Sequence, residues 1–421
     1  MKYVIITRRV SSMGGAQLYV LRRSLHLKVS GYEVFIVVSL HESYFPLEKQ
    51  FKNIPIIQVK EVGTYAALQS KKRQNEILDN LNAIVGGANK CIIESHSLPS
   101  VEWGELFAAR FGGRHLAYPL SEPIVAKYRF QPGKRIFNEK LKIGEFYGCN
   151  SKSLSLIFNS QNVPSNYVNI GYDENELCKE SLPRINYDKS KGDFVISTVT
   201  RLDKTYVECL VKASAELAVK YNNQKFVVLI AGGCIDKNRE LYLKTNYNNE
   251  KFGLGNLDIR YLGYINKLGK DIFNLSDVFV GMGTASINAI SQGCLTINID
   301  PQFGMKYASG FFGVDTKNFA YSDSEKHYSI FSKLEEAYLL DDTKRKQFRR
   351  IGRSLYEEEY ETIQCFMNLD KVVESLSVVK KRDSLQVSFF YRVGVRFLNN
   401  AKNALRELSV IILNKIKVMM S

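Results

Sequence analysis

Between residues 194 and 300 the chain alternates short apolar runs with longer stretches of helical periodicity. The apolar runs cover residues 194–199, 226–231, 257–262, 277–280 and 295–299. Short buried strands that alternate with helices are typical of βαβ units, which form a parallel sheet. In such a sheet ligands bind beyond the carboxyl ends of the strands. We therefore expect a binding site at that edge.

The residues that follow these runs are cations, hydroxyls and glycines. They are Arg201 and Lys204 after the first run, Gly232 after the second, Tyr264 after the third, and Gly283, Thr284, Ala285 and Ser286 after the fourth. Cationic side chains and the free amides at a helix start both favour an anion. This edge is therefore predicted to bind a phosphate group.

A second array of the same kind opens the chain. Residues 3–7 are predicted to form a strand, and a helix follows that ends at Gly31. Between them Gly14 and Gly15 allow an anion to approach the backbone at a helix N-terminus, or simply make a tight turn. Their spacing does not match the GxGxxG pattern of dinucleotide sites. Further strands are predicted at residues 32–40, 90–94, 115–120 and 167–170, and helices at 77–85, 102–111, 323–340, 343–355 and 357–379.

Two candidate catalytic residues follow strands of this first half. His96 lies in a Ser-His-Ser segment after residues 90–94. It is either a catalytic histidine or a capping, hydrogen-bonded one. Glu122 follows residues 115–120 and is either a carboxylate of the site or a residue near the start of the next segment.

Composition limits the functional classes. A length of 421 residues suggests two or three domains. The net charge of +15 points to an anionic partner. The seven cysteines include no CxxC pair, which argues against a disulfide framework or a zinc site. With no DxD motif either, we expect neither a metal nor another cofactor. No run approaches the ~18 apolar residues that a membrane-spanning helix needs.

Two basic segments predict contact with an anionic membrane surface. Residues 380–421 hold nine Lys and Arg against two acidic residues, and residues 385–420 have an amphipathic helical pattern. Between residues 127 and 142, six cations are interleaved with aromatic and aliphatic side chains. Both segments suit a peripheral location on the cytoplasmic face of the cell membrane. The alternatives are a solvated loop for the first-half segment and packing against the N-terminal half for the tail. Single-stranded nucleic acid lacks any supporting motif, so no nucleic acid is expected as a partner.

In order and spacing, the motifs of the chain resemble those of the GT-B glycosyltransferases. The likeness is strongest to the large retaining family 4, of the bacterial surface-polysaccharide type, which uses nucleotide-sugar donors. The matching segments are Gly14-Gly15-Ala16-Gln17 (a GGAE/GGAQ loop), Thr200-Arg201-Leu202-Asp203-Lys204 (a shortened GRLxxxKG), Leu262-Gly263-Tyr264-Ile265 (FLGYV), Ser276-Asp277-Val278-Phe279-Val280 (SADVFV) and Ile287-Asn288-Ala289-Ile290-Ser291-Gln292-Gly293 (LEAMAxG).

The resemblance implies an α/β GT-B fold, with two Rossmann-like parallel-sheet domains, a cleft between them and C-terminal helices. It places an acceptor-binding domain at residues 1–180, a nucleotide-sugar-binding domain at 181–356, and helices with a basic amphipathic tail at 357–421. The implied activity is transfer of a hexosyl-like sugar, with retention of stereochemistry, from a nucleotide-sugar donor to a saccharide or lipid-linked acceptor in bacterial cell-surface polysaccharide synthesis.

The resemblance also assigns roles to the candidate residues. The catalytic candidates are His96, Glu122, Arg201 and Lys204. The candidates for donor binding are Gly14, Gly15, Arg201, Lys204, Gly232, Tyr264, Gly283, Thr284, Ala285, Ser286 and Asn288.

The sequence departs from the family pattern at its paired glutamates, Glu-x7-Glu. Asn288 stands where the second glutamate binds the ribose, and the loop that would carry the first is shortened. An asparagine can accept one hydrogen bond from a ribose, without the charge that strengthens it. Two alternatives follow: a catalytically weak GT-B-shaped scaffold or partner subunit, and a nucleotide-sugar 2-epimerase. The epimerase would need further acid and base residues in the cleft.

Overall fold

The structure is a computed structural model that describes residues 1–10, 14–39, 51, 53–87, 90–121, 133–234, 236–324 and 326–380. Three predictions fall outside the described residues: Glu122, the basic segment as far as residue 132, and the amphipathic tail at 385–420. In the described part of the chain, no helix is both long enough and apolar enough to cross a membrane.

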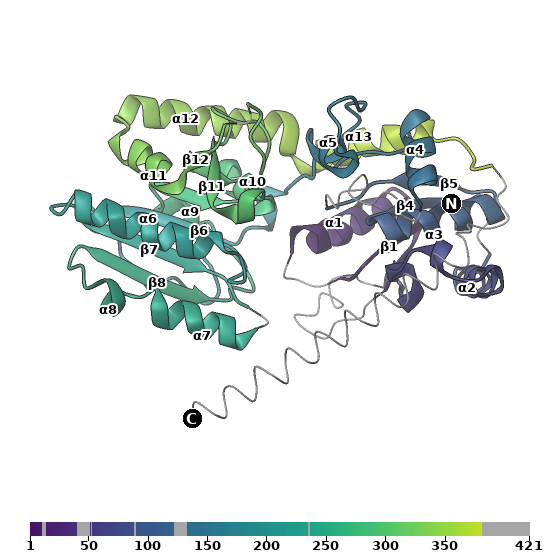
Figure 1. Ribbon diagram of the computed structural model, residues 1–421, viewed down its shortest axis with the longest axis horizontal. Helices are drawn as coiled ribbons and strands as arrows, with labels where there is room; N and C mark the ends of the chain where they lie inside the picture. The colour runs from purple at the N-terminus through teal and green to yellow at the C-terminus, as the bar shows by residue number, and fades with distance from the viewer. Residues whose placement is uncertain are drawn as a thin grey trace.

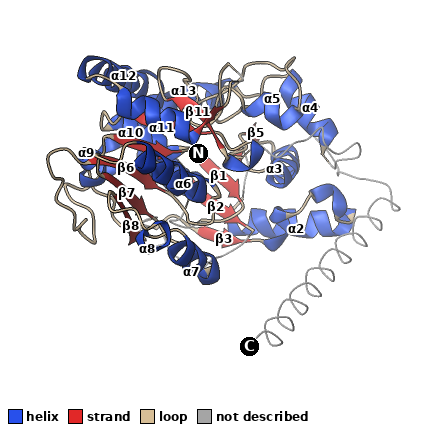
Figure 2. Ribbon diagram, turned by 60° about the vertical axis from the view of Figure 1, so that its left-hand side comes forward, coloured by secondary structure: helices blue, strands red, loops and turns tan. Residues whose placement is uncertain are grey.

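The N-terminal lobe is built on a five-stranded sheet in the order β3-β2-β1-β4-β5, in which every pair is parallel. Its strands are β1 (Lys2–Thr7), β2 (Glu33–Val38), β3 (Ile56–Gln58), β4 (Ile92–Ser95) and β5 (Arg114–Ala117). Its helices are α1 (Gly15–Val29), α2 (Lys71–Ile84), α3 (Leu98–Phe111), α4 (Lys134–Lys142) and α5 (Ser153–Phe158). Figures 1 and 2 show these helices packed around the sheet.

The C-terminal lobe is built on a seven-stranded sheet in the order β12-β11-β10-β9-β6-β7-β8. Its strands are β6 (Phe194–Val199), β7 (Phe226–Ala231), β8 (Leu257–Gly263), β9 (Val278–Gly281), β10 (Thr296–Ile299), β11 (Tyr307–Phe311) and β12 (Tyr328–Ser329). Its helices are α6 (Tyr206–Lys220), α7 (Lys237–Asn246), α8 (Asn249–Phe252), α9 (Asp271–Leu275), α10 (Thr284–Ser291), α11 (Ile330–Leu339) and α12 (Asp342–Leu355). The five strands from β6 to β10 are parallel, and β11 and β12 are antiparallel.

Each sheet buries both of its faces, as a parallel sheet with crossover helices must. In β6, Phe194 and Ile196 pack with α6 and α11 in one apolar cluster. The intervening Val195 packs with α9 and α10 in another. This two-sided burial explains why the strands have continuous apolar sequences.

Several helices begin at a side-chain cap, and the two at the junction of the lobes do not. Ser97 caps α3, Asp236 caps α7 and Asp341 caps α12, each by accepting from backbone amides. By contrast, α1 and α10 begin at Gly14 and Gly283, which have no side chain to supply. The first amides of those two helices therefore have no cap from their own N-cap residue.

The structure corrects three secondary-structure predictions, and it contains strands that were not predicted. Residues 167–170 contribute only an isolated bridge rather than a strand. Helix α11 begins at Ile330 rather than near residue 323, because β12 precedes it. A π-helical turn, Tyr356–Tyr360, separates α12 from α13 (Thr362–Ser375) and shortens the predicted last helix. Strand β11 was missed.

The chain crosses between the lobes twice, and the two crossings lie side by side. The amide of Tyr172 donates to the carbonyl of Tyr360 at 2.9 Å. A Cβ on Gly171 would lie 2.6 Å from the Cα of Thr362, so the first crossing has room only for glycine. After the second crossing, α13 packs on the N-terminal lobe (Figure 1).

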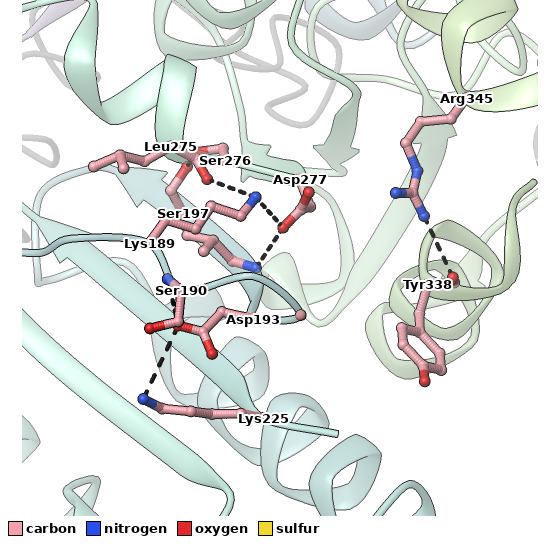
Figure 3. Close-up of polar contacts among 12 residues, drawn as sticks. Lys189, Ser190, Asp193, Ser197, Lys225, Leu275, Ser276, Asp277, Tyr338 and Arg345 are labelled. Atoms are coloured by element: carbon pink, nitrogen blue, oxygen red, sulfur yellow. Dashed lines mark hydrogen bonds and ion pairs between the residues drawn. The ribbon is translucent and has the colours of Figure 1, made fainter. Parts of the chain in front are cut away.

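At the amino ends of β6 and β7, cations are paired with local acceptors (Figure 3). Lys189 Nζ lies 2.6 Å from Asp277 Oδ2, and Lys225 Nζ lies 4.0 Å from Asp193. Arg345 donates to the carbonyl of Tyr338 at 3.4 Å and to two other carbonyls at the end of α11. Each of these three cations therefore has at least one acceptor within the protein.

Candidate functional site

The first turns of α1 and α10 meet where the lobes touch. A Cβ placed on Gly15 would lie 2.5 Å from Oγ1 and 2.8 Å from Cγ2 of Thr284, so the Gly15 backbone is in contact with that side chain. Gly283, which precedes α10, has φ 67°, a left-handed value that glycine adopts readily. The structure thus brings together the two glycine-led helix starts predicted from the sequence.

The turn after β6 carries the two predicted cations. The amide of Lys204 donates to the carbonyl of Arg201 at 3.2 Å, which holds both residues in one turn. Arg201 Nε lies 3.2 Å from Asp203 Oδ1, and both side chains are more than a third exposed. Because β6 is hydrogen-bonded to β9, this turn and the start of α10 lie at the same edge of the sheet.

Lys204 is a half-buried ammonium group without a carboxylate partner. Within the described residues, no acidic side chain forms an ion pair with its Nζ. Burial lowers the pKa of Lys204, the neighbouring positive charge of Arg201 lowers it further, and the carboxylate of Asp203 offsets only part of this decrease. Two cations that repel each other at a strand end would both be stabilised by a bound anion.

The glycines after β7 support the Arg201 turn. The amide of Gly232 donates to Gly263 O at 2.8 Å, and a Cβ on Gly232 would lie only 1.6 Å from Thr200 O. The carbonyl of Gly233 accepts from the amide of Leu202 at 3.1 Å. These contacts give Gly232 a packing role. Tyr264, half-buried, lies directly against Gly233.

Helix α10 buries two polar atoms without partners. Among the described residues, neither Ser286 Oγ nor Asn288 Oδ1 has a hydrogen-bond partner, although both residues are buried. The Asn288 amide lies near the Tyr172 hydroxyl: burial raises the pKa of Tyr172, and hydrogen bonding with Asn288 counteracts part of that increase. Unsatisfied buried polar atoms are uncommon in proteins, and two of the eight found among the described residues lie in α10.

The structure places His96 inside the N-terminal lobe, in a buried polar cluster. Its Nε2 lies 2.7 Å from Glu94 Oε1. Glu94 also accepts hydrogen bonds from Tyr3, Tyr19 and Arg23. The pKa of Glu94 is held at about 2 because these partners outweigh its burial.

The hydrogen-bonded interpretation of His96 agrees with these contacts. Its Nδ1 is buried and has no hydrogen-bond partner in the part of the chain that the structure describes. No contact between described residues joins His96 to Arg201 or Lys204. Glu122, the other candidate of this half, lies outside the described residues.

Two interlobe contacts had no signal in the sequence. Arg22 of α1 forms a bidentate ion pair with Glu176 and lies 4.7 Å from the ring centroid of Tyr172. Asn318 Nδ2 donates to Asn150 Oδ1 at 3.1 Å. Each pair joins residues more than a hundred positions apart, so no local spacing predicts it.

Among the described residues, no group of three or more His, Cys, Asp or Glu side chains is arranged to hold a metal ion. The cations, amides and hydroxyls at the junction of the lobes are chemically suited to an anion.

No protein-family model matches the sequence, and neither does any curated protein. Comparison with solved structures gives a different result. The sucrose-phosphate synthase of Thermosynechococcus elongatus superposes with a TM-score of 0.62 at 14% identity, covering 89% of this chain and 98% of its own. Anabaena HepE, solved in complex with UDP and glucose, superposes with a TM-score of 0.59 at 12% identity. The match covers 89% of this chain and 100% of HepE. An E. coli protein solved with bound UDP-2-fluoro glucose superposes with a TM-score of 0.58 at 12% identity. The match covers 89% of this chain and 99% of the E. coli chain.

The chain has the GT-B fold. The predicted α/β architecture is therefore confirmed. In this GT-B chain the carboxyl ends of both sheets meet at the Gly15–Thr284 contact.

Proposed function

We propose that this protein is a glycosyltransferase that binds the diphosphate of a nucleotide-sugar donor between Arg201, Lys204 and the start of α10. The observation that carries the proposal is the half-buried Lys204 ammonium, which lacks a carboxylate partner among the described residues and lies in the same turn as Arg201. The cations at the opposite edge of the sheet are paired, as Lys189 and Lys225 show.

Transfer of a sugar from such a donor leaves negative charge on the departing diphosphate. Fixed cations and helix amides that are already aimed at the developing charge lower the barrier to this step. Arg201 and Lys204 would stabilise the charge from the β6 side, and the amides of Gly283, Thr284 and Ala285 from the start of α10. Gly14 and Gly15 would close the site from the N-terminal lobe, which we propose binds the acceptor.

The remaining donor contacts are assigned by position. Asn288, with its unpartnered oxygen, is proposed to accept a hydrogen bond from the ribose, and Ser286 is the second unpartnered group of α10. Gly232 and Tyr264 lie at the end of the neighbouring strands, where the rest of the nucleotide would extend. His96 and Glu122 remain candidate catalytic residues by sequence.

We further propose a retaining transfer to a saccharide or lipid-linked acceptor in bacterial cell-surface polysaccharide synthesis, at the cytoplasmic face of the membrane. The excess of seven positive charges in residues 380–421 supports an anionic surface as partner. WaaG, described as a glycosyltransferase involved in lipopolysaccharide biosynthesis, superposes with a TM-score of 0.52 at 10% identity.

A catalytically weak scaffold is the second candidate, because Asn288 replaces a charged residue of the family and is largely buried beside Tyr172. Isothermal calorimetry with UDP, GDP and ADP, followed by hydrolysis assays with the matching glucose donors, separates the two. A glycosyltransferase binds one nucleotide and hydrolyses or transfers its sugar. Nucleotide binding without turnover of any donor supports the scaffold, and no binding of any nucleotide refutes the proposed site.

A further inference from the structure

Three aromatic rings meet at the surface beside the Lys204 turn, and the proposed donor site leaves them without a role. The ring centroids of Phe303 and His327 are 4.8 Å apart, and Tyr307 lies 6.3 Å from the first and 6.4 Å from the second. Phe303 is 59% exposed and Tyr307 is 41% exposed. Large aromatic side chains in a cluster are usually buried, so an exposed group of three calls for a ligand.

The loop that carries these rings is fixed to the edge of the sheet where the donor is proposed to bind. It follows β10, the neighbour of β9, and therefore starts from the same carboxyl edge. The hydroxyl of Thr205, the residue after Lys204, donates to the carbonyl of Gly304. The amide of Asp300 donates to Tyr307 O at 2.9 Å. The rings thus lie beside the proposed phosphate cations.

The backbone of this loop is strained, and the strain is not offset by burial of the Phe303 ring. Phe303, Gly304 and Met305 have φ values of 49°, 70° and 60°. A residue other than glycine is energetically unfavourable in this region. Met305 packs against the core of the lobe, whereas Phe303 does not. Such strain is typical of loops that present a side chain for binding.

Hydrogen-bonding groups are interleaved with the rings. His327 Nδ1 lies 3.3 Å from Oδ2 of Asp300, whose side chain is 1% exposed. Asp300 Oδ1 in turn accepts from the amide of Gln302 at 2.8 Å. This pair orients the imidazole. In the described part of the chain, neither the Tyr307 hydroxyl nor Nε2 of His327 has a hydrogen-bond partner.

We propose that Phe303, Tyr307 and His327 form a saccharide-binding platform on the C-terminal lobe, which completes, beside the donor, the acceptor site proposed on the N-terminal lobe; this rests on the proposed glycosyltransferase function. A pyranose has an apolar C–H face that packs on an aromatic ring and hydroxyls at its edge that bond to polar groups. Exposed rings with an oriented imidazole and a phenol match both features. A purely apolar partner would have no use for the Asp300–His327 pair.

Saturation-transfer NMR tests the platform, with six defined probes: methyl β-glucoside, methyl β-galactoside, methyl N-acetyl-β-glucosaminide, cellobiose, lactose and chitobiose. The spectra are recorded with and without UDP. The variants are Phe303→Ala, Phe303→Leu and, as a control, Tyr242→Ala, which removes a ring that is 45% exposed on α7. Thermal melting confirms that each variant folds.

We expect at least one probe to bind the wild-type protein. Both Phe303 variants should then raise its Kd about tenfold or more, because leucine keeps the apolar volume and loses the ring face, while Tyr242→Ala changes it less than about twofold. The platform is overturned if Phe303→Ala binds the saccharide with the same Kd as the wild-type protein. It is also overturned if the wild-type protein binds none of the six probes.

UDP affinity, measured by calorimetry on the same samples, keeps the two proposals apart. Phe303→Ala should bind UDP like the wild type. If instead it loses UDP binding as strongly as saccharide binding, the ring stacks on the nucleotide and the acceptor platform is wrong. If the wild type binds saccharide through Phe303 and binds no nucleotide, the donor site fails while the platform stands.

Discussion

Gly15 and Thr284 come from different sheets, 269 positions apart in sequence, yet the Gly15 backbone packs directly against the Thr284 side chain. Both residues begin helices, and both helices start at uncapped glycines. The contact therefore fixes how closely two helix N-termini approach each other across the junction of the lobes.

Gly15→Ala is expected to push these helix starts apart, because its Cβ would lie 2.5 Å from Thr284 Oγ1. Overpacking of this kind typically costs about 1–3 kcal/mol. UDP affinity should fall, and small-angle scattering should show a larger radius of gyration. Adding Thr284→Ala removes Oγ1 and Cγ2 and should restore both values. Gly255→Ala is the control, since a Cβ there meets nothing within 4 Å. If Gly15→Ala and Gly255→Ala have the same UDP affinity and the same radius of gyration, the Gly15–Thr284 contact does not set the spacing of the two helix N-termini.

Arg201→Ala and Lys204→Ala should each weaken binding of a nucleoside diphosphate by ~1–3 kcal/mol, as the loss of a charge-assisted hydrogen bond would. Their melting temperatures should stay close to that of the wild type, because neither side chain is buried in the core. Lys237→Ala, which removes an exposed cation paired with Glu240 on α7, is the matched control. Calorimetry measures the nucleoside-diphosphate affinity of each variant. If both Arg201→Ala and Lys204→Ala bind the nucleotide as tightly as the wild-type protein, these residues do not bind its phosphates.

Arg23→Ala is expected to destabilise the N-terminal lobe by about 3–5 kcal/mol, because it leaves the buried carboxylate of Glu94 without its cation. It also removes the 2.6 Å ion pair to Asp370 of α13. Urea unfolding followed by the fluorescence of Trp103, the single tryptophan, reports on this lobe. Arg110→Ala breaks a surface pair with Asp79 and should cost less than about 1 kcal/mol. Similar losses in the two variants would contradict the buried-charge argument.

The contribution of Glu102 to the free energy of unfolding should decrease as the pH rises from about 4.3 to about 8. Burial raises the pKa of this carboxyl to about 8 in the folded protein, whereas the unfolded chain ionises near pH 4.3. Between these values the unfolded state binds fewer protons than the folded state, so the contribution to stability decreases by up to about 1.4 kcal/mol per pH unit. Below the lower value it is fully present.

Glu102→Gln removes this titration and keeps an oxygen that can accept from the amide of Ala67. Urea midpoints at pH 5, 6, 7 and 8 should therefore fall less steeply with pH in the variant than in the wild type. Parallel pH profiles would mean that Glu102 is ionised in the folded protein.

The apolar runs and their spacing were enough to predict parallel βαβ sheets, and the resemblance of the motifs supplied the GT-B arrangement. Strands β6 to β10 are buried on both faces, and such strands have continuous apolar sequences. Strand β11 was missed because its sequence, Tyr-Ala-Ser-Gly-Phe, is short and only partly apolar. The position of Arg201 and Lys204 beside the start of α10 could be predicted, because the carboxyl ends of parallel strands lie at one edge of the sheet.

What the sequence could not show are the pairings between distant residues. The Arg23–Asp370 pair spans 347 positions, and it depends on α13 packing on the first lobe. That no described carboxylate forms an ion pair with Lys204 is likewise a property of the folded chain. The ring cluster at Phe303 depends on β11 and β12, which place Tyr307 and His327 side by side.

The two adjacent crossings impose an order on folding during synthesis. Residues 172–360 lie between the crossings, so the whole C-terminal sheet can form as soon as that stretch has left the ribosome. The first lobe, although translated earlier, still lacks α13, whose Phe366 packs against Tyr19 and whose Asp370 is a second carboxylate for Arg23. The N-terminal lobe therefore cannot complete its packing until the C-terminal lobe and α13 have left the ribosome. Until then part of its apolar surface is exposed, and Arg23 has only Glu94 as a carboxylate partner.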